Sequence, residues 1–310
     1  MASLRLIFAG SGPFGAAALE SLQASNHTLC AVLSQPDRPA GRRLKLRPTP
    51  VSEIALGASL PLLRPDALDA SVCDELASHH ADALVVADFG RLIPESWLWL
   101  CPGGSLNIHA SLLPRWRGAA PIARAVEAGD STGGCTIMLM DAGLDTGDIL
   151  AQEAIPFAPD ETAASARARL APLGADLLLR YLSDFDPKHP ARQPQDETQA
   201  CHAPALRKNE APIDWANPAT RIAAKIRAFN PHPVATTRCG DETLRLWQAQ
   251  AHSTQTAEPA GKVLRCDPTG LWVACGEGQV QIAELQRAGG RRMSAQDFCN
   301  ARPLTGLQLA

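Results

Sequence analysis

Short apolar runs alternate with helix-like segments along the first half of the chain. The apolar runs are expected to form strands that are buried on both faces, and they span Leu4–Ala9, Leu29–Ser34, Ala83–Asp88, Ser105–His109 and Cys135–Met140. Apolar residues recur at helical spacing in the stretches Phe14–Leu22, Pro50–Gly57, Ala67–His79 and Ala119–Ala128. This alternation requires crossover connections, so it predicts an α/β fold with a mainly parallel sheet and helices on both faces.

The same pattern continues into the middle of the chain. A further strand is expected at Asp148–Ile155, and Glu161–Tyr181 repeats apolar residues as a docked helix does. Pro172 is expected to kink that helix, because proline cannot donate a backbone hydrogen bond. We therefore predict a first domain over residues 1–183.

The pattern changes after Tyr181. Residues 184–208 are polar, contain four prolines and lack any period, which predicts a linker. Asn217 and Pro218 then fit the N-cap and the first position of a helix. Short strand-like runs and a final helix capped by Ser294 follow, and the runs span Thr243–Gln250, Gly261–Leu264, Leu271–Ala274 and Gln279–Leu285. They predict a second domain at 209–310, a small β-barrel of the oligonucleotide-binding (OB) type.

The composition is that of an ordinary globular protein, with 45% apolar and 20% charged residues over 310 positions. The longest apolar runs are far shorter than the roughly 18 residues that a membrane span needs, and Met1–Phe8 is too short for a signal peptide. Nine cysteines without a C-x-x-C pair argue against a disulfide framework and a structural zinc site. We therefore expect a cytoplasmic protein with reduced thiols and no membrane partner.

Charge is distributed unevenly between the two halves. Residues 1–200 carry 16 Lys and Arg against 23 Asp and Glu, whereas residues 201–310 carry 13 against 9. A basic second half indicates contact with an anionic partner, although a solvated surface gives the same balance.

Two short motifs suggest nucleotide chemistry, but the sequence around each lacks a residue or loop that the motif requires. Gly10–Gly15 matches G-x-G-x-x-G between a strand and a helix, but no acid follows the second predicted strand near Ser34, as a nicotinamide-binding oxidoreductase requires. Asp88-Phe89-Gly90 matches the metal-binding triplet of kinases, but the chain has no H-R-D loop. We interpret Gly10–Gly15 as a tight strand-to-helix turn.

Asn107 and His109 form the most informative pair. They are two residues apart at the end of a predicted strand, so both side chains project from one face toward the crevice beyond the carboxyl edge. This position suits an amide and an imidazole that act on one substrate, whereas a lone histidine is as often structural. Ser111–Pro114 then leaves the strand as a rigid apolar turn that suits the flank of a flat ligand.

Three aspartates follow the Cys135–Met140 strand, again at a strand's carboxyl end. Asp141, Asp145 and Asp148 suggest magnesium, but two glycines make the segment a turn, so the spacing does not place the carboxylates on one face. We expect Asp145 to be the partner of His109, where it would hold the tautomer and stabilise the charged ring, and we expect no metal. The alternative is an acidic, solvated turn.

The segment Pro36–Pro50 is rich in basic residues and prolines. Five of its residues are basic and none between them is acidic; they are Arg38, Arg42, Arg43, Lys45 and Arg47. A structureless basic loop beside an active-site edge fits contact with a phosphate backbone, and the alternative is a solvated charge run.

Five blocks in chain order resemble the formyltransferases that use 10-formyltetrahydrofolate, and among these the ones that act on methionyl-tRNA. The blocks are Gln35–Arg42, Ser111–Ile122, Gly143–Asp148, Arg227–Pro231 and Met293–Asp297. The resemblance implies a Rossmann-like formyltransferase domain followed by a C-terminal OB-like β-barrel. It also implies formyl transfer from 10-formyltetrahydrofolate to the α-amino group of methionine on initiator tRNA, by an enzyme that we expect to be a monomer.

The resemblance also assigns roles to residues. The family's catalytic Asn, His and Asp fall on Asn107, His109 and Asp145. Its folate-binding residues fall on Ser111, Leu112, Leu113 and Pro114, and on Asp88, Phe89 and Gly90. Its tRNA-binding loop falls on the five basic residues of Pro36–Pro50, with Arg42 as the base-side contact.

The chain departs from the family pattern at three places. Gly10-Ser11-Gly12 replaces Gly-Thr-Pro, Asp88 and Arg91 add an acid and a base near the expected pterin pocket, and Ala205 replaces a common lysine. Two other functions remain open: formyl transfer to a small amine, which leaves the basic loop unexplained, and RNA binding on a degenerate enzyme scaffold, which leaves the intact Asn, His and Asp unexplained.

Overall fold

The computed structural model describes residues 3–40 and 45–310, which form two compact units. The first unit comprises the described residues of 1–119, 133–155 and 167–203, and the second comprises 120–132, 156–166 and 204–310. No helix within the described residues is long and apolar enough to cross a membrane. All nine cysteines are free, and burial raises the pKa of Cys101, Cys135 and Cys275 to about 12.

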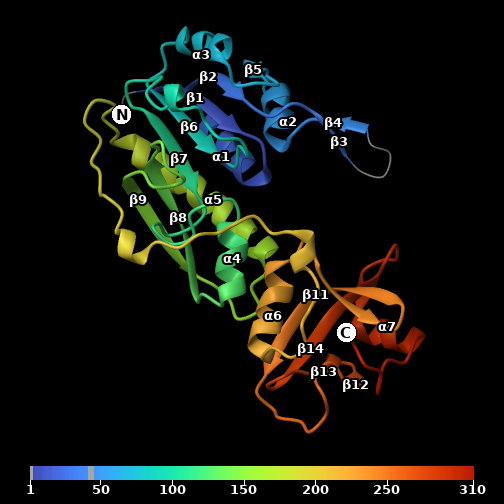
Figure 1. Cartoon of the computed structure of the whole chain (residues 1–310). Helices are drawn as coiled ribbons and strands as arrows, with labels where there is room; N and C mark the ends of the chain where they lie inside the picture. The colour runs from blue at the N-terminus through green and yellow to red at the C-terminus, as the bar shows by residue number, and fades with distance from the viewer. Residues whose placement is uncertain (1–2, 41–44) are drawn as a thin grey trace. The chain divides into compact units, whose positions relative to one another are not determined.

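A seven-stranded sheet forms the centre of the first unit (Figure 1). Its strand order is β5-β2-β1-β6-β7-β8-β9, and the pairs among β5, β2, β1, β6 and β7 are parallel. The strands are β1 (Arg5–Gly10), β2 (Thr28–Leu33), β5 (Leu62–Leu63), β6 (Ala83–Ala87), β7 (Ser105–His109), β8 (Thr132–Leu139) and β9 (Ile149–Pro156). The mainly parallel α/β sheet expected from the sequence is confirmed.

Helices bury both faces of the parallel strands. On one face, Ile7 and Leu84 pack with Leu76 of α3 (Ala70–Ala77) and with Trp97. On the other face lies α1 (Pro13–Gln23), which buries Phe14, Ala18, Leu19 and Leu22 and contacts β1, β2 and β6. Burial on both faces explains why these strands are continuous apolar runs in the sequence.

Several helix ends follow from their capping residues. Thr49 caps α2 (Pro50–Gly57) by accepting from the Ser52 amide, and Asp69 caps α3, which is shorter than expected. The long helix α5 (Ala163–Ser183) contains Pro172 in its interior, and α4 spans Pro121–Ala128. The helix α6 (Ala219–Ala228) begins one residue later than expected, because the Asn217 amide donates to Asp214 instead of capping the helix.

The sequence suggested a structureless loop for the basic segment after β2. The structure shows regular secondary structure in its described residues instead. The segment forms a two-stranded antiparallel hairpin, β3 (Arg38–Ala40) and β4 (Lys45–Arg47), in which Arg38 pairs with Arg47. The hairpin extends away from the sheet of the first unit (Figure 1). Arg42 and Arg43 lie outside the described residues.

The strand β8 does not run parallel to its neighbour β7, as crossover connections alone would require. β8 runs antiparallel to β7, with Leu106 opposite Leu139 and His109 opposite Thr136. The carboxyl end of β8 therefore lies beside the beginning of β7, not at the edge where β7 ends. The parallel pattern expected for these strands therefore does not extend to β8, and Asp141–Asp148 leaves the sheet at the edge opposite to the one where His109 lies.

An antiparallel sheet forms most of the second unit. Its strand order is β10-β11-β14-β13-β12, and the short strand β15 (Met293–Ser294) pairs with β14. The strands are β10 (Ala235–Cys239), β11 (Glu242–His252), β12 (Val263–Asp267), β13 (Gly270–Ala274) and β14 (Gln279–Arg287). Ser294 caps the helix α7 (Ala295–Ala301), as expected, by accepting from the Asp297 amide.

The C-terminal segment 306–310 closes this sheet into a barrel. On one side the Arg238 and Ala310 backbones exchange two hydrogen bonds at 2.7 and 2.9 Å. On the other side the Leu309 amide donates to the Gly261 carbonyl at 2.8 Å, and the Val263 amide donates to the Leu307 carbonyl at 2.9 Å. Closure leaves neither β10 nor β12 as an open edge, which is how small barrels avoid edge-to-edge pairing.

Closure of the barrel predicts that the Leu309 side chain contributes far more to the free energy of unfolding than that of Leu307. Leu309 is 2% exposed and Leu307 is 39% exposed. We expect Leu309→Ala to lower the free energy of unfolding by about 2–5 kcal/mol, because truncation leaves a cavity beside the closing segment. Leu307→Ala is the matched control, with an expected change below about 1 kcal/mol, and urea denaturation measures both. Equal effects of the two substitutions would contradict the closing role.

Candidate active site

Asn107 and His109 lie on one face of β7, close to its end. His109 is 6% exposed, whereas Asn107 is half-buried. Within the described chain, the Asn107 side-chain amide makes no hydrogen bond, which leaves its donors and its acceptor available to a ligand. The pairing expected from the two-residue spacing is therefore present in the structure.

The His109 ring is oriented by a backbone carbonyl. Its Nε2 lies 2.9 Å from the carbonyl oxygen of Trp116. A carbonyl oxygen only accepts, so Nε2 carries a proton and donates. From the sequence, Asp145 is expected to hold the tautomer, whereas in the structure the hydrogen bond that fixes the proton on Nε2 is made to the Trp116 carbonyl. The Nδ1 atom faces the other way, toward Asp145.

Asp145 brings a carboxylate to the Nδ1 side of His109. The distance from His109 Nδ1 to Asp145 Oδ2 is 3.7 Å, which is an ion-pair distance when the ring is protonated and is longer than a hydrogen bond. The same oxygen accepts from the Gly118 amide at 2.7 Å. Asp145 has a φ of 55°, in the left-handed region that costs a non-glycine residue energy. The structure thus brings Asp145 to His109, and Asn107 lies two residues before His109 on the same strand, although Asp145 arrives from a segment that folds back from the end of β8.

The turn Ser111–Pro114 is fixed by two side chains from neighbouring strands. Thr136 of β8 donates to the Ser111 carbonyl at 2.6 Å and accepts from the Leu113 amide at 3.1 Å. Gln152 of β9 donates to the Leu113 carbonyl at 2.8 Å and to Thr136 Oγ1 at 2.9 Å. The peptide bond between Leu113 and Pro114 is cis. Sequence reasoning identified the turn but missed Thr136 and Gln152, which lie in strands without a motif.

Asp88 fills the turn after β1 with a carboxylate. Its Oδ2 accepts from the Phe14 amide at the start of α1, and a Cβ on Gly12 would lie 1.9 Å from the same oxygen. A dinucleotide would place its phosphate at this helix start, so the chain's own carboxylate replaces that ligand. Desolvation raises the pKa of Asp88, against the opposing effects of the Arg167 charge and the Phe14 hydrogen bond.

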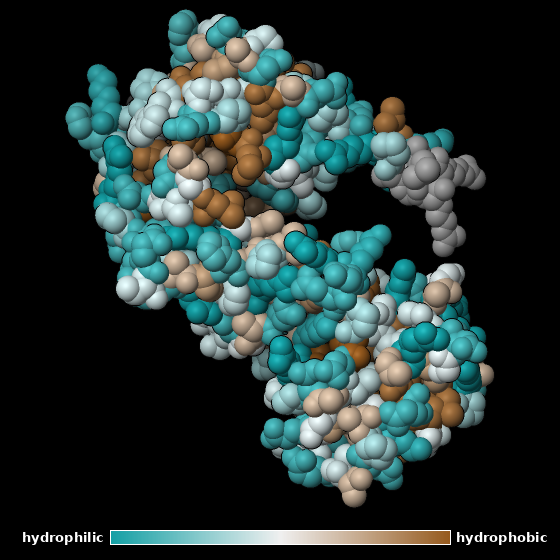
Figure 2. Space-filling model, in the orientation of Figure 1, coloured by the Kyte–Doolittle hydropathy of each residue, from teal (hydrophilic) through white to brown (hydrophobic). Residues whose placement is uncertain are grey.

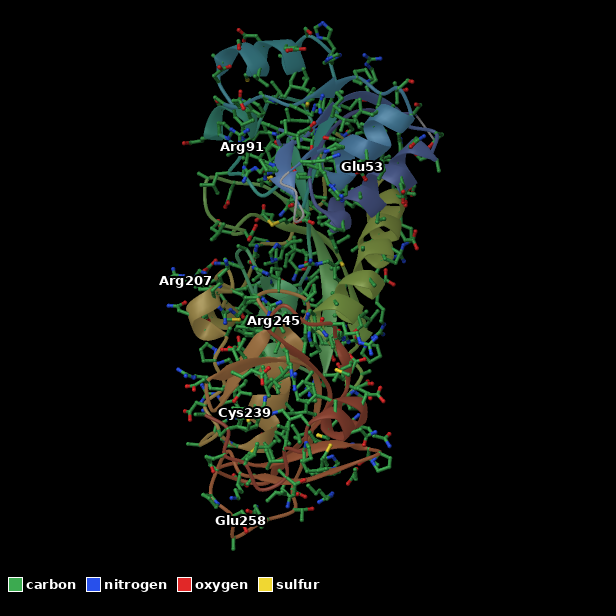
Figure 3. All side chains as sticks on the ribbon, turned by 90° about the vertical axis from the view of Figure 1, so that its right-hand side faces the viewer. Glu53, Arg91, Arg207, Cys239, Arg245 and Glu258 are labelled. Atoms are coloured by element: carbon green, nitrogen blue, oxygen red, sulfur yellow. The ribbon has the colours of Figure 1, made fainter. Side chains whose placement is uncertain are left out.

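The residues that follow Asp88 divide between core and surface. The Phe89 ring is 2% exposed in the core with Trp97, and its carbonyl accepts from the Gln35 side chain at 2.7 Å. Gly90 is exposed, with a φ of 71°. Arg91, labelled in Figure 3, donates to the carbonyls of Pro65 and Asp66. Any ligand contact from Phe89 would therefore come from its backbone, and the Arg91 guanidinium has partners within the chain.

The described basic residues of the hairpin are exposed. Arg38, Lys45 and Arg47 form no ion pair with any described residue. The nearest acid in the sequence, Asp37, is paired instead with Arg64 at 2.7 Å. The hairpin thus presents uncompensated positive charge, as contact with phosphate requires.

The segment expected to be a linker packs along the loop that follows β7. The Arg117 backbone donates to the Cys201 carbonyl at 2.9 Å and accepts from the Ala203 amide at 2.7 Å, while the Trp116 amide donates to Cys201 Sγ at 3.3 Å. Arg117 is 3% exposed and forms an ion pair with Glu197. Hydrogen bonding between them raises the pKa of Arg117 and lowers that of Glu197. Sequence reasoning missed these contacts because the segment has no period.

The barrel of the second unit carries stacked basic and aromatic side chains. The Arg265 guanidinium lies 3.9 Å from the centroid of the Trp272 ring, and the His252 ring lies 4.5 Å from it. The face of the second unit drawn in Figure 2 is largely hydrophilic, whereas hydrophobic side chains gather on the first unit.

Across the part of the chain that the structure describes, no group of three or more His, Cys, Asp or Glu side chains is placed to hold a metal ion.

Two family models cover most of the chain. Residues 4–182 match the model described as formyl transferase, and residues 205–303 match the model described as formyl transferase, C-terminal domain. The methionyl-tRNA formyltransferase of Chromobacterium violaceum is 47% identical over 97% of this chain and 97% of its own. That of Thiobacillus denitrificans is 47% identical over 97% of this chain and 98% of its own.

Two solved structures share the fold at low sequence identity. HypX from Aquifex aeolicus, in complex with tetrahydrofolic acid, has a TM-score of 0.67 and 16% identity, over 98% of this chain and 49% of that chain. The N-formyltransferase from Helicobacter canadensis, with folinic acid and dTDP-3-aminofucose, has a TM-score of 0.67 and 15% identity, over 92% of this chain and 100% of that chain.

The hydrogen bonds of Thr136 predict that its hydroxyl stabilises the turn at Ser111–Pro114. Thr136 is fully buried, so Thr136→Val leaves the Ser111 carbonyl and the Leu113 amide without this partner. We expect the free energy of unfolding to fall by about 1–3 kcal/mol. Thr132→Val, the same change at an exposed position of β8, is the control and should change stability by less than about 0.5 kcal/mol. A Thr136→Val protein as stable as the control would show that the turn is held by other contacts.

Proposed function

The chain belongs to the formyl transferase family, and we propose that Asn107, His109 and Asp145 carry out its reaction. The enzyme is a methionyl-tRNA formyltransferase that uses 10-formyltetrahydrofolate as its co-substrate. It transfers the formyl group to the α-amino group of methionine on initiator methionyl-tRNA, for translation initiation. The products are N-formylmethionyl-tRNA and tetrahydrofolate. The observation that carries the assignment of the residues is the 3.7 Å approach of Asp145 to His109, which lies two residues from Asn107 on β7; the Asn107 amide makes no hydrogen bond to a described residue.

The chemistry requires little activation of the nucleophile. An α-amino group has a reference pKa of about 7.7–8.0, so a useful fraction is unprotonated at neutral pH. The amine attacks the formyl carbon, a carbon–nitrogen bond forms, and negative charge develops on the formyl oxygen. In this mechanism the Asn107 amide donates a hydrogen bond to that oxygen, which is worth about 3–4 kcal/mol for a well-placed donor.

Proton transfer completes the reaction. The attacking nitrogen becomes positively charged, and the departing folate nitrogen needs a proton when its bond to the formyl carbon breaks. We assign this transfer to His109 Nδ1, because Nε2 is engaged with the Trp116 carbonyl. The Asp145 carboxylate stabilises the ring while Nδ1 carries the proton.

The remaining assignments concern the two substrates. Residues 1–183 are proposed as the catalytic domain, with Ser111–Pro114 and Asp88–Gly90 binding the folate, and 184–208 as the connection to the second domain. The hairpin residues Arg38, Lys45 and Arg47 are proposed to bind tRNA, as are Arg42 and Arg43, which lie outside the described residues. The barrel domain, 209–310, is proposed to bind tRNA too, and the stacked Arg265 and Trp272 support this. We propose a monomer that acts in the cytoplasm.

The catalytic assignment predicts losses in turnover rather than in folate binding. We expect Asn107→Ala, His109→Ala and Asp145→Asn each to lower kcat by about 100-fold or more, because each removes an interaction made in the transition state. The KM for 10-formyltetrahydrofolate should change by less than about 3-fold. Asp74→Asn, at an exposed position of α3, is the control. Steady-state kinetics with both substrates measure the effects, and a substitution that leaves kcat unchanged removes that residue from the mechanism.

The proposed function predicts that the enzyme formylates one acceptor much faster than similar ones. The purified protein with 10-formyltetrahydrofolate should formylate initiator methionyl-tRNA at least about 100-fold faster than elongator methionyl-tRNA, measured by transfer of isotope-labelled formyl groups. Small amines, including an amino-sugar nucleotide and glycinamide ribonucleotide, serve as alternative acceptors. Activity toward a small amine alone would contradict the proposal and favour a small-molecule formyltransferase.

A further inference from the structure

Asp145 lies in a segment without regular secondary structure. No described residue of Asp141–Asp148 belongs to a helix or a strand, and the backbone of Asp145 has the left-handed φ of 55°. Its carboxylate has one backbone donor, Gly118. A strained residue in an irregular segment keeps its conformation only when neighbouring contacts determine it. The contacts that fix the backbone of Asp145 therefore decide where the carboxylate lies.

Gln195 makes those contacts. Its Nε2 donates to the Asp145 carbonyl at 2.8 Å and to the Gly147 carbonyl at 2.7 Å. Its Oε1 accepts from Arg117 Nε at 3.0 Å and from Arg117 Nη2 at 2.8 Å. Carbonyls only accept and a guanidinium only donates, so the amide group fits in one orientation alone. Each atom of the Gln195 amide thus has two matched partners.

Arg117, which donates to the Gln195 side-chain oxygen, is itself held in place by other residues. Its guanidinium is held by the carboxylate of Glu197 at 2.7 and 2.9 Å, and its backbone pairs with Cys201 and Ala203. The next residue, Gly118, donates to the Asp145 carboxylate. Arg117 therefore holds Asp145 in two ways, through Gln195 at the main chain and through Gly118 at the side chain.

We propose that Gln195 is a positioning residue for the reaction, which holds the Asp145 backbone so that its carboxylate faces His109. Gln195 does not touch the reacting atoms in this scheme. The proposal extends the proposed function, since it assumes that Asp145 acts on His109 during formyl transfer. It also gives the segment that joins the two domains a role in catalysis.

The first test is Gln195→Met, which keeps the length of the side chain and removes its four hydrogen bonds. A carboxylate displaced by about 1 Å costs up to about 100-fold in rate, so kcat should fall by about 10- to 100-fold. The KM values for both substrates should change by less than about 3-fold. Gln199→Met is the matched control, because the Gln199 side chain is exposed and its one hydrogen bond to a described residue goes to Asp196, nearby in the same segment. Its kcat should stay within about 2-fold of the wild type.

A double-mutant cycle separates positioning from a merely structural role. In the Asp145→Asn background the carboxylate is already lost, so adding Gln195→Met should lower kcat by less than about 2-fold. Gln195→Glu presents a carboxylate oxygen to the two carbonyls, so it should lower kcat as Gln195→Met does, both alone and in the Asp145→Asn background. It replaces Gln195→Met in the test if that variant does not fold. An unchanged kcat in the folded Gln195 variants, or a loss that multiplies with that of Asp145→Asn, overturns the proposal. A wild-type protein that does not formylate methionyl-tRNA instead overturns the proposed function.

Discussion

The almost fully buried guanidinium of Arg117 has to be neutralised and hydrogen-bonded, and this requirement organises the site. A buried, unpaired charge costs several kcal/mol, so the chain must bring it acceptors. Glu197 and Gln195 supply them from one segment, and they thereby hold that segment against the loop after β7. The second function of the Gln195 amide follows from its chemistry: once its oxygen faces Arg117, its NH₂ group must find acceptors, and the carbonyls of the Asp145 segment are those acceptors.

Much of the fold was predictable because burial leaves a strong periodic signal. The apolar runs at β1, β6 and β7 and the capped helices α2 and α7 are local features, and they are present in the structure. The direction of β8 was not predictable, since a strand that ends the parallel series has the same apolar pattern in either direction. The strand β10, Ala-Thr-Thr-Arg-Cys, was missed because it is short and half polar. Its pairing with β11 and with the C-terminal segment depends on partners that are distant in the sequence.

The site was predictable to the extent that its residues have reactive side chains. Asn107 and His109 follow from strand geometry. Asp145 was expected from its turn after a strand, with an acidic, solvated turn as the alternative, and the resemblance to a family pointed to the same residue. The partner of His109 Nε2 is a backbone carbonyl, which carries no sequence signal because every residue has one. Thr136, Gln152 and Gln195 are ordinary polar residues whose roles depend on contacts with distant segments. Sequence patterns identify reactive groups more readily than the groups that orient them.

Backbone strain connects these orienting contacts with the chemistry. Asp88, Trp116 and Asp145 are non-glycine residues with φ values of 49°, 64° and 55°, and each costs on the order of 1–3 kcal/mol. Trp116 turns its carbonyl toward His109, and Asp145 turns its carboxylate toward the other side of the same ring. Regular secondary structure cannot supply both contacts, because β7 ends at His109 and the next strand runs in the opposite direction. Two strained turns therefore enclose one imidazole, and hydrogen bonds from Gly118 and Gln195 offset the strain at Asp145.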